Sequence, residues 1–142
     1  MDPNENTKLI SAIPGGAAFV SWHARQFQSP LSFHDSEVVE LRLNRTEGSR
    51  LTLAVDPPGP ARLIFVLKDW IDVQLEGFSH QNVIGEMHLR PAEDRDAKPW
   101  ELGVGLSPGT IELVLEPCFG ANGTIRATIE RIEFDPGAGL TR

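Results

Sequence analysis

The sequence predicts an all-β protein: a mainly antiparallel β-sandwich or open barrel of about eight strands, with one or two short helices near the N-terminus. Apolar and polar residues alternate along most of the chain, which is the period of a strand with one solvent-exposed face, whereas the 3.6-residue period of helices is scarce. Turn-forming segments separate these stretches at regular spacing. The 142 residues suit a single domain, residues 1–142, with flexible tails expected over residues 1–6 and 136–142.

Short helices are expected in the N-terminal third of the chain. Residues 7–13, TKLISAI, fit a short helix that Thr7 caps and that ends near Pro14. Residues 15–27 fit a second short helix, although two glycines and a mixed pattern leave that assignment open.

The first strands form a predicted hairpin. Val39, Leu41 and Leu43 alternate with polar residues, and the segment 51–55 repeats the pattern. The four residues TEGS between them are typical of a turn, so the two strands are expected to pair. Val39, Leu41 and Leu43 are expected to point into the core.

The middle of the chain predicts three further strands. Residues 63–67 are apolar without interruption, as in a strand covered on both faces, while residues 70–78 and 83–90 alternate. The residues expected to point inward from the two alternating segments are Ile71, Val73, Leu75, Val83, Met87 and Leu89.

The last third predicts a weak strand over residues 100–106 and then a hairpin. Segments 111–117 and 123–135 flank the pair Asn122–Gly123, which is a strong hairpin signal. The inward apolar residues of the last strand change from odd to even numbers after Ile129, so we expect a β-bulge near Glu130 and Arg131.

Composition limits the class of function. The formal charge of −7 argues against nucleic acid as a partner, because neutralising phosphates needs a surplus of Lys and Arg. An acidic surface suits a basic protein partner or simply solubility. The single cysteine, Cys118, forms no intrachain disulfide and is expected to be a small buried side chain. Without a secretory signal or an apolar run of bilayer length, we expect a cytoplasmic protein with no membrane partner and no cofactor.

Seven polar residues make up the first group of candidate site residues: His34, Asp35, Glu37, His80, Asn82, Glu86 and His88. A zinc ion could use His88 and Glu86 with His34 or Asp35, but this needs ligands to converge, and exposed side chains are the favoured interpretation. A hydrolytic interpretation of His34–Asp35–Ser36 is weak, since adjacent residues on an extended chain point to opposite faces. We instead expect Asp35 or Ser36 to bond backbone amides where the first strand begins. No metal site and no catalytic residue is therefore predicted.

The second group lies on the polar faces of the strands. Its members are Glu40, Asp72, Gln74, Glu76, Glu112 and Glu116, with Thr124, Arg126, Thr128 and Glu130 on the same side of their strands. If these strands are neighbours, the first six form an acidic face that could bind a basic protein. The alternative is the ordinary solvated side of a sandwich.

Three stretches carry a family resemblance. They are Phe33–His34–Asp35 with Glu37, Leu75–Glu76–Gly77–Phe78 followed by Asn82–Val83, and Gly120 before the last strand. Over residues 32–134 the chain resembles small bacterial domains of unassigned function, some of them grouped with immunity family fifty of the polymorphic toxin systems. The resemblance implies a non-catalytic protein that binds and neutralises a cognate toxin, and it carries no catalytic residues over to this chain.

Two classes of function follow. The first is a non-catalytic protein-binding module whose acidic sheet face docks a basic partner, such as a toxin enzyme. The alternative is a small metal-dependent or hydrolytic enzyme that uses His34, Asp35, His80, Glu86 and His88. A homodimer through the sheet edges or the Trp100 segment also stays open.

Overall fold

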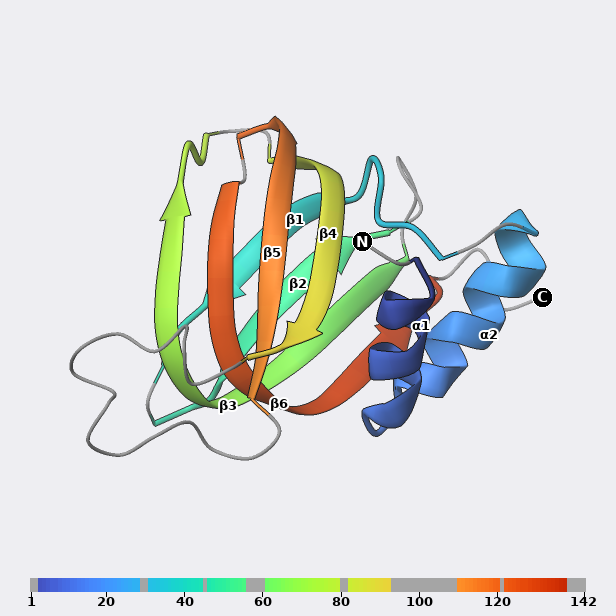
Figure 1. Ribbon diagram of the computed structural model, residues 1–142, viewed down its shortest axis with the longest axis horizontal. Helices are drawn as coiled ribbons and strands as arrows, with labels where there is room; N and C mark the ends of the chain where they lie inside the picture. The colour runs from blue at the N-terminus through green and yellow to red at the C-terminus, as the bar shows by residue number, and fades with distance from the viewer. Residues whose placement is uncertain are drawn as a thin grey trace.

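Six antiparallel strands form a closed barrel in the order β1-β2-β3-β6-β5-β4, with two helices beside it (Figure 1). The computed structural model describes residues 3–28, 31–44, 46–55, 61–79, 82–92, 110–120 and 122–137. The elements are α1 (Pro3–Ala12), α2 (Gly16–Phe27), β1 (Glu37–Arg42), β2 (Ser49–Ala54), β3 (Arg62–Glu76), β4 (Val83–Pro91), β5 (Thr110–Phe119) and β6 (Asn122–Asp135). The predicted all-β class with short N-terminal helices is confirmed.

β3 is one strand where the sequence predicts two. Its first part, residues 62–67, pairs with β2, and it pairs with β6 along both parts, with an irregularity between Lys68 and Asp72. The strand bends strongly as it follows the barrel wall (Figure 1). The strand predicted over residues 100–106 lies outside the described residues.

A β-bulge in β1 changes which side chains enter the core. The β1–β2 register shifts between Val38 and Glu40, so Val39 is an extra residue. Val38 is consequently buried, Leu41 is half-buried, and Val39 and Leu43 are 46% and 44% exposed. The expectation that Val39 and Leu43 point inward is wrong: the bulge places Val39 out of the alternation, and Leu43 lies after the end of β1 at Arg42.

The bulge predicted in the last strand is confirmed. Arg131 and Ile129 face consecutive residues of β3, which leaves Glu130 as the extra residue. Ile129 and Ile132 are both buried as a result. The hairpin of β5 and β6 is also confirmed, although Asn122 pairs with β3 as part of β6 and does not form the turn itself.

A further bulge, at Gly85 of β4, was not predicted. Gly85 is an extra residue relative to β5, so Ile84 is fully buried and Val83 is only half-buried. The expectation that Val83 is the inward residue is therefore wrong, whereas Met87 and Leu89 are fully buried as expected.

The two helices complete the core. α1 packs against β4 and α2 against β6, and the ring of Phe19 contacts those of Trp22, Phe33 and Phe134. Their apolar residues join the barrel interior in one hydrophobic cluster. Neither helix of the described residues has the length and hydropathy that crossing a bilayer requires.

Gly15 allows the turn between the helices to approach β6. The Ile132 amide donates to the Pro14 carbonyl over 2.8 Å. Gly15 has φ +86°, and a Cβ placed on it would lie 2.0 Å from the Ile132 carbonyl oxygen. Only glycine fits both the left-handed conformation and this close approach.

Asn6 anchors α1 to the free edge of β4. Its side-chain amide donates to the Met87 carbonyl over 2.9 Å, and its oxygen accepts from the Leu89 amide over 2.8 Å. Asn6 thus takes the place of a peptide group in a neighbouring strand. Because α1 starts at Pro3 and Asn6 is buried, the expectation of a flexible tail is wrong for residues 3–6, and Thr7 lies inside the helix instead of capping it.

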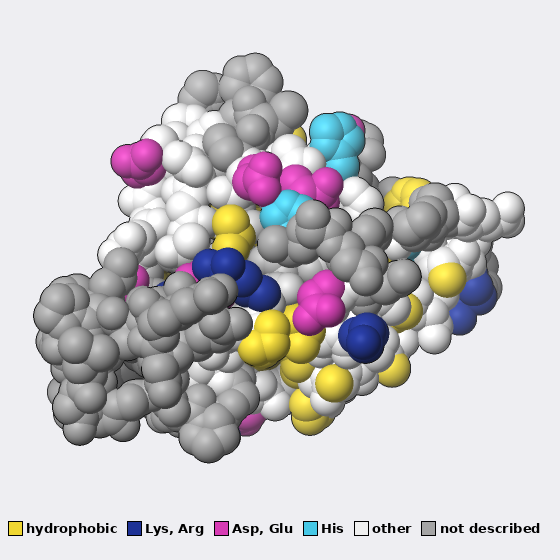
Figure 2. Space-filling view, viewed as in Figure 1, with side chains coloured by type: hydrophobic (Ala, Val, Ile, Leu, Met, Phe, Trp, Pro, Cys, Tyr) yellow, Lys and Arg dark blue, Asp and Glu magenta, His cyan; other side chains and the backbone are white. Residues whose placement is uncertain are grey.

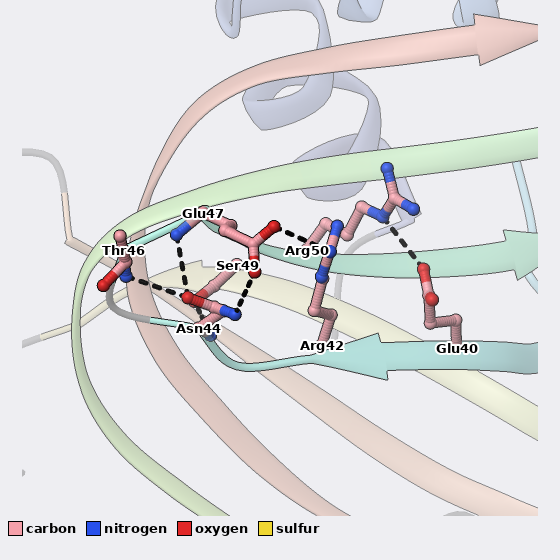
Figure 3. Close-up of polar contacts among 7 residues, drawn as sticks. All are labelled: Glu40, Arg42, Asn44, Thr46, Glu47, Ser49 and Arg50. Atoms are coloured by element: carbon pink, nitrogen blue, oxygen red, sulfur yellow. Dashed lines mark hydrogen bonds and ion pairs between the residues drawn. The ribbon is translucent and has the colours of Figure 1, made fainter.

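The predicted turn of the β1–β2 hairpin is built around Asn44 (Figure 3). Its side-chain oxygen accepts hydrogen bonds from the backbone amides of Thr46 and Glu47 over 2.9 and 2.8 Å. The backbone amide of Asn44 donates to Ser49 Oγ over 3.0 Å. Asparagine favours such local bonds, which is why it initiates turns.

Candidate functional site

One row of charged side chains crosses four strands on the outer face of the barrel. Asp72 of β3 faces Arg126 of β6, which faces Glu112 of β5, which in turn faces Arg90 of β4. The Arg90 Nε donates to Glu112 Oε1 over 2.6 Å, and Arg126 lies 3.8 Å from Glu112 and 4.0 Å from Asp72. We call these four residues the charge ladder; their signs alternate, so each carboxylate has a guanidinium beside it.

The charge ladder is largely buried. Arg126 is 2% exposed and Glu112 is 5% exposed, and the Asp72 side chain is 11% exposed. Arg126 is the largest fully buried side chain of the described residues. Asp72 and Glu112 were expected on an acidic face that binds a partner. The structure instead buries them, with their carboxylates beside guanidinium groups of the same chain.

A second group of charges lies on β4, on β5 and in the segment before β1, and it is more exposed than the charge ladder. We call Asp35, Glu86 and Glu116, with His34 and His88, the acidic patch. His34 Nε2 lies 3.5 Å from Asp35 Oδ1, and His88 Nε2 lies 2.9 Å from Glu116 Oε2. Figure 2 shows acidic and histidine side chains gathered over β4 and β5. The structure therefore brings together four residues of the first predicted group and one of the second.

Glu86 and Glu116 are directly opposite each other on β4 and β5. Glu116 is 61% exposed on its side chain and Glu86 is half-buried. Like charges in opposite positions of a sheet repel and reduce its stability. The acidic patch thus has an arrangement that the fold alone does not favour.

His34 is held in place by the backbone of β4. Its Nδ1–H donates to the carbonyl of Gly85 over 2.8 Å, and Asp35 and Glu86 lie nearby. The Gly85 carbonyl, and then the Asp35 carboxylate, raise the pKa of His34 above its ordinary value. Protonation of His34 would therefore place a positive charge inside the acidic patch.

The segment before β1 joins the barrel through its backbone. The Asp35 amide donates to the Ile84 carbonyl over 2.9 Å, and the Ile84 amide donates to the Ser36 carbonyl over 2.7 Å. Backbone groups thus make the contacts that we expected from the side chains of Asp35 or Ser36. Ser36 is 2% exposed, so its hydroxyl is not accessible as the nucleophile of a hydrolytic site.

The remaining predicted residues do not join the acidic patch. The Asn82 side chain accepts from the Ser79 backbone amide and donates to the Ser79 carbonyl, each over 2.9 Å. Glu37 is half-buried at the pairing of β1 with Val83. His80 lies outside the described residues.

Three more residues of the second group are exposed on the barrel wall. Glu40 pairs with Arg50 over 2.9 Å (Figure 3). Glu76 accepts from the Asn122 side chain over 3.2 Å, and Gln74 is exposed. They face Thr52, Thr124 and Asn122 on the neighbouring strands, so they belong to cross-strand pairs other than those of the charge ladder.

Metal binding needs several ligand side chains to converge on one point. Within the described ranges, no three His, Cys, Asp or Glu side chains are arranged to hold a metal ion. His34 and His88 are instead each paired with a single carboxylate. The ligand set that zinc requires is not assembled from these residues.

A cavity of about 460 Å³ opens between β1 and the second part of β3. Its apolar lining comes from Val38, Val39, Leu41, Val73, Leu75 and Phe78. Glu40 and Asn82 complete the margin. The sequence analysis missed this cavity; the exposed Phe78 after Gly77 was a local signal, but β1 and β3 are brought together only by the barrel.

No protein-family model matches this chain, and no similar protein was found among curated proteins or solved structures.

Proposed function

We propose that this protein is a non-catalytic binding module that docks a basic surface of a partner protein on the acidic patch. The observation that carries the proposal is the cross-strand pair of half-buried Glu86 and exposed Glu116. Like charges in directly opposite positions reduce the stability of a sheet. Residues that break a local rule of folding are commonly those that serve function.

Electrostatics favours a basic partner. The acidic patch holds three carboxylates against two histidines, and the whole chain carries a net charge of −7. Lys or Arg side chains of a partner would relieve the repulsion between Glu86 and Glu116. Complementary charge also accelerates the encounter of two proteins.

The resemblance to immunity family fifty suggests the partner to test first. It implies that a toxin enzyme is bound and neutralised, and a cytoplasmic location would suit that role. The protein encoded beside this one is therefore the first candidate to measure.

The test compares the wild type with the double variant Glu86→Gln/Glu116→Gln. We expect the immobilised wild type to retain the neighbouring gene product at low salt, and we expect the double variant to bind it about tenfold more slowly, because steering charges act mainly on the association rate. Surface plasmon resonance at several salt concentrations measures both rates.

A matched control removes the same charge elsewhere. Glu130 and Glu133 are exposed carboxylates that both pair with Arg131 on β6. The variant Glu130→Gln/Glu133→Gln should bind like the wild type. Equal losses in the two double variants would show that only net charge matters, and failure of the wild type to retain the partner at low salt would reject the proposal.

A further inference from the structure

The second part of β3 has one edge with which no described strand pairs. Residues 72–76 pair with β6 on one side, whereas β2 pairs only with residues 62–67. No strand among the described residues pairs with the other edge of residues 73–76. An unpaired edge presents peptide N–H and C=O groups that can accept another strand.

The apolar cavity lies directly beside this free edge. Val73 and Leu75 line it from β3, and Val38 and Leu41 line it from β1. Phe78 is 41% exposed at its margin. Ligand sites have this size and this mostly apolar lining, and the mouths of β-barrels are among their usual places.

We propose that an extended segment of a partner protein adds to β3 at residues 73–76, with alternate side chains entering the cavity. Addition of a strand supplies main-chain hydrogen bonds to the edge, and neighbouring pockets select every second side chain. This site goes beyond the proposed function, because it uses none of the residues of the acidic patch.

The two faces of β3 define the chemistry of the segment. Val73 and Leu75 are on the cavity side, so the side chains that lie next to them should be apolar. Gln74 and Glu76 are exposed on the other face, and Glu76 carries a negative charge. The segment should therefore alternate apolar residues with Lys or Arg.

Two other occupants fit less well. If a second copy of this chain paired antiparallel about Gln74, Asp72 would face Glu76 of the other copy, and opposed carboxylates repel. A small apolar molecule would fill the cavity but would leave the peptide groups of the edge unpaired. A basic and apolar strand satisfies both features.

The experiment uses a capped seven-residue peptide of alternating lysine and valine as the probe. We expect it to bind at least about tenfold more tightly than a peptide of the same composition with its valines consecutive, since only strict alternation presents one apolar face. Nuclear magnetic resonance of the full chain should show shift changes and slowed amide exchange at residues 73–76.

Backbone methylation of the probe tests strand addition itself. N-methyl groups at alternate positions remove one set of peptide donors, so methylation in one register should abolish binding, while the other register should retain it. Equal effects in both registers, or equal binding of the two valine orders, would overturn the proposal.

A charge reversal on the protein provides the second control. Glu76→Lys changes an exposed side chain and should weaken the lysine–valine peptide about fivefold, because it replaces a surface attraction with a repulsion. It should strengthen binding of the corresponding glutamate–valine peptide. Binding that is unchanged by this reversal would contradict the expected orientation of the segment.

Discussion

The charge ladder and the acidic patch lie on the same outer face of β4 and β5, but they differ in which charges face one another. In the charge ladder, Arg90 faces Glu112, and both belong to a row in which the signs alternate. In the acidic patch, Glu86 faces Glu116; these residues are four positions before Arg90 on β4 and four positions after Glu112 on β5. The central residues of the first row, Arg126, Glu112 and Asp72, are paired and buried, whereas Glu116 of the second is exposed and Glu86 is half-buried.

The difference shows that the residue opposite a carboxylate on the neighbouring strand decides whether its charge is balanced within the fold. Glu112 and Glu116 have equivalent positions in the alternation of β5. One contacts guanidinium groups and is 5% exposed, while the other is 61% exposed on its side chain. Four predictions can break or sharpen this comparison, from the largest expected effect to the smallest.

Loss of the central cation should break the charge ladder. Arg126→Leu would remove the guanidinium between Glu112 and Asp72. We expect the free energy of unfolding to fall by about 3–5 kcal/mol, as when one partner of a buried ion pair is removed. Urea denaturation measures the change, and a loss within the error of the measurement would show that the ladder is not a stabilising unit.

Neutralising one carboxylate in each region should change the free energy of unfolding by different amounts. Glu112→Gln weakens charge-assisted hydrogen bonds to Arg90 in a buried place and should cost about 1–3 kcal/mol. Glu116→Gln changes an exposed side chain and should alter stability by less than about 0.5 kcal/mol. Equal costs in the two variants would contradict the division between ladder and patch.

Relief of repulsion should stabilise the acidic patch. Glu86→Gln removes one of two like charges in opposite positions and should raise the free energy of unfolding by about 0.2–1 kcal/mol. The gain should shrink at high salt, which screens exposed charges. A variant that is less stable than the wild type at low salt would remove the argument that this pair is kept for binding.

Two histidines should give small pH effects of opposite sign. The pKa of His34 is raised, mainly by the Gly85 carbonyl, so its contribution to stability is complete below the ordinary value of 6.5 and is lost as the pH rises through the folded-state pKa. Burial lowers the pKa of His23, so folding favours its neutral form and stability falls as the pH drops below 6.5.

Variants of the two histidines should separate these effects. On acidification from about pH 8 to about pH 5, a range that spans ordinary histidine titration, His34→Asn should lose more stability than the wild type, and His23→Phe should lose less. Denaturation curves at each pH measure both. Identical pH profiles in all three proteins would refute the assignment of these shifts.

The sequence alone determined the features that depend on neighbours along the chain. Strict alternation predicted the strands, a four-residue turn predicted the β1–β2 hairpin, and the change of phase after Ile129 predicted the bulge at Glu130. His34, Asp35, Glu86 and His88 were also identified as polar residues of interest. In each case a side chain's direction follows from its position within one segment.

Only the tertiary structure decided which charges face one another and which edges stay free. Which strands are paired determines the bulges at Val39 and Gly85. It also determines where Asn6 bonds to β4 in place of a strand, and how the charge ladder is divided from the acidic patch. Pairing joins residues that are distant in sequence, as when Asp72 faces Arg126. The alternation of polar residues is the same on both sides of such a pair, so it carries no information about the sign of the charge opposite.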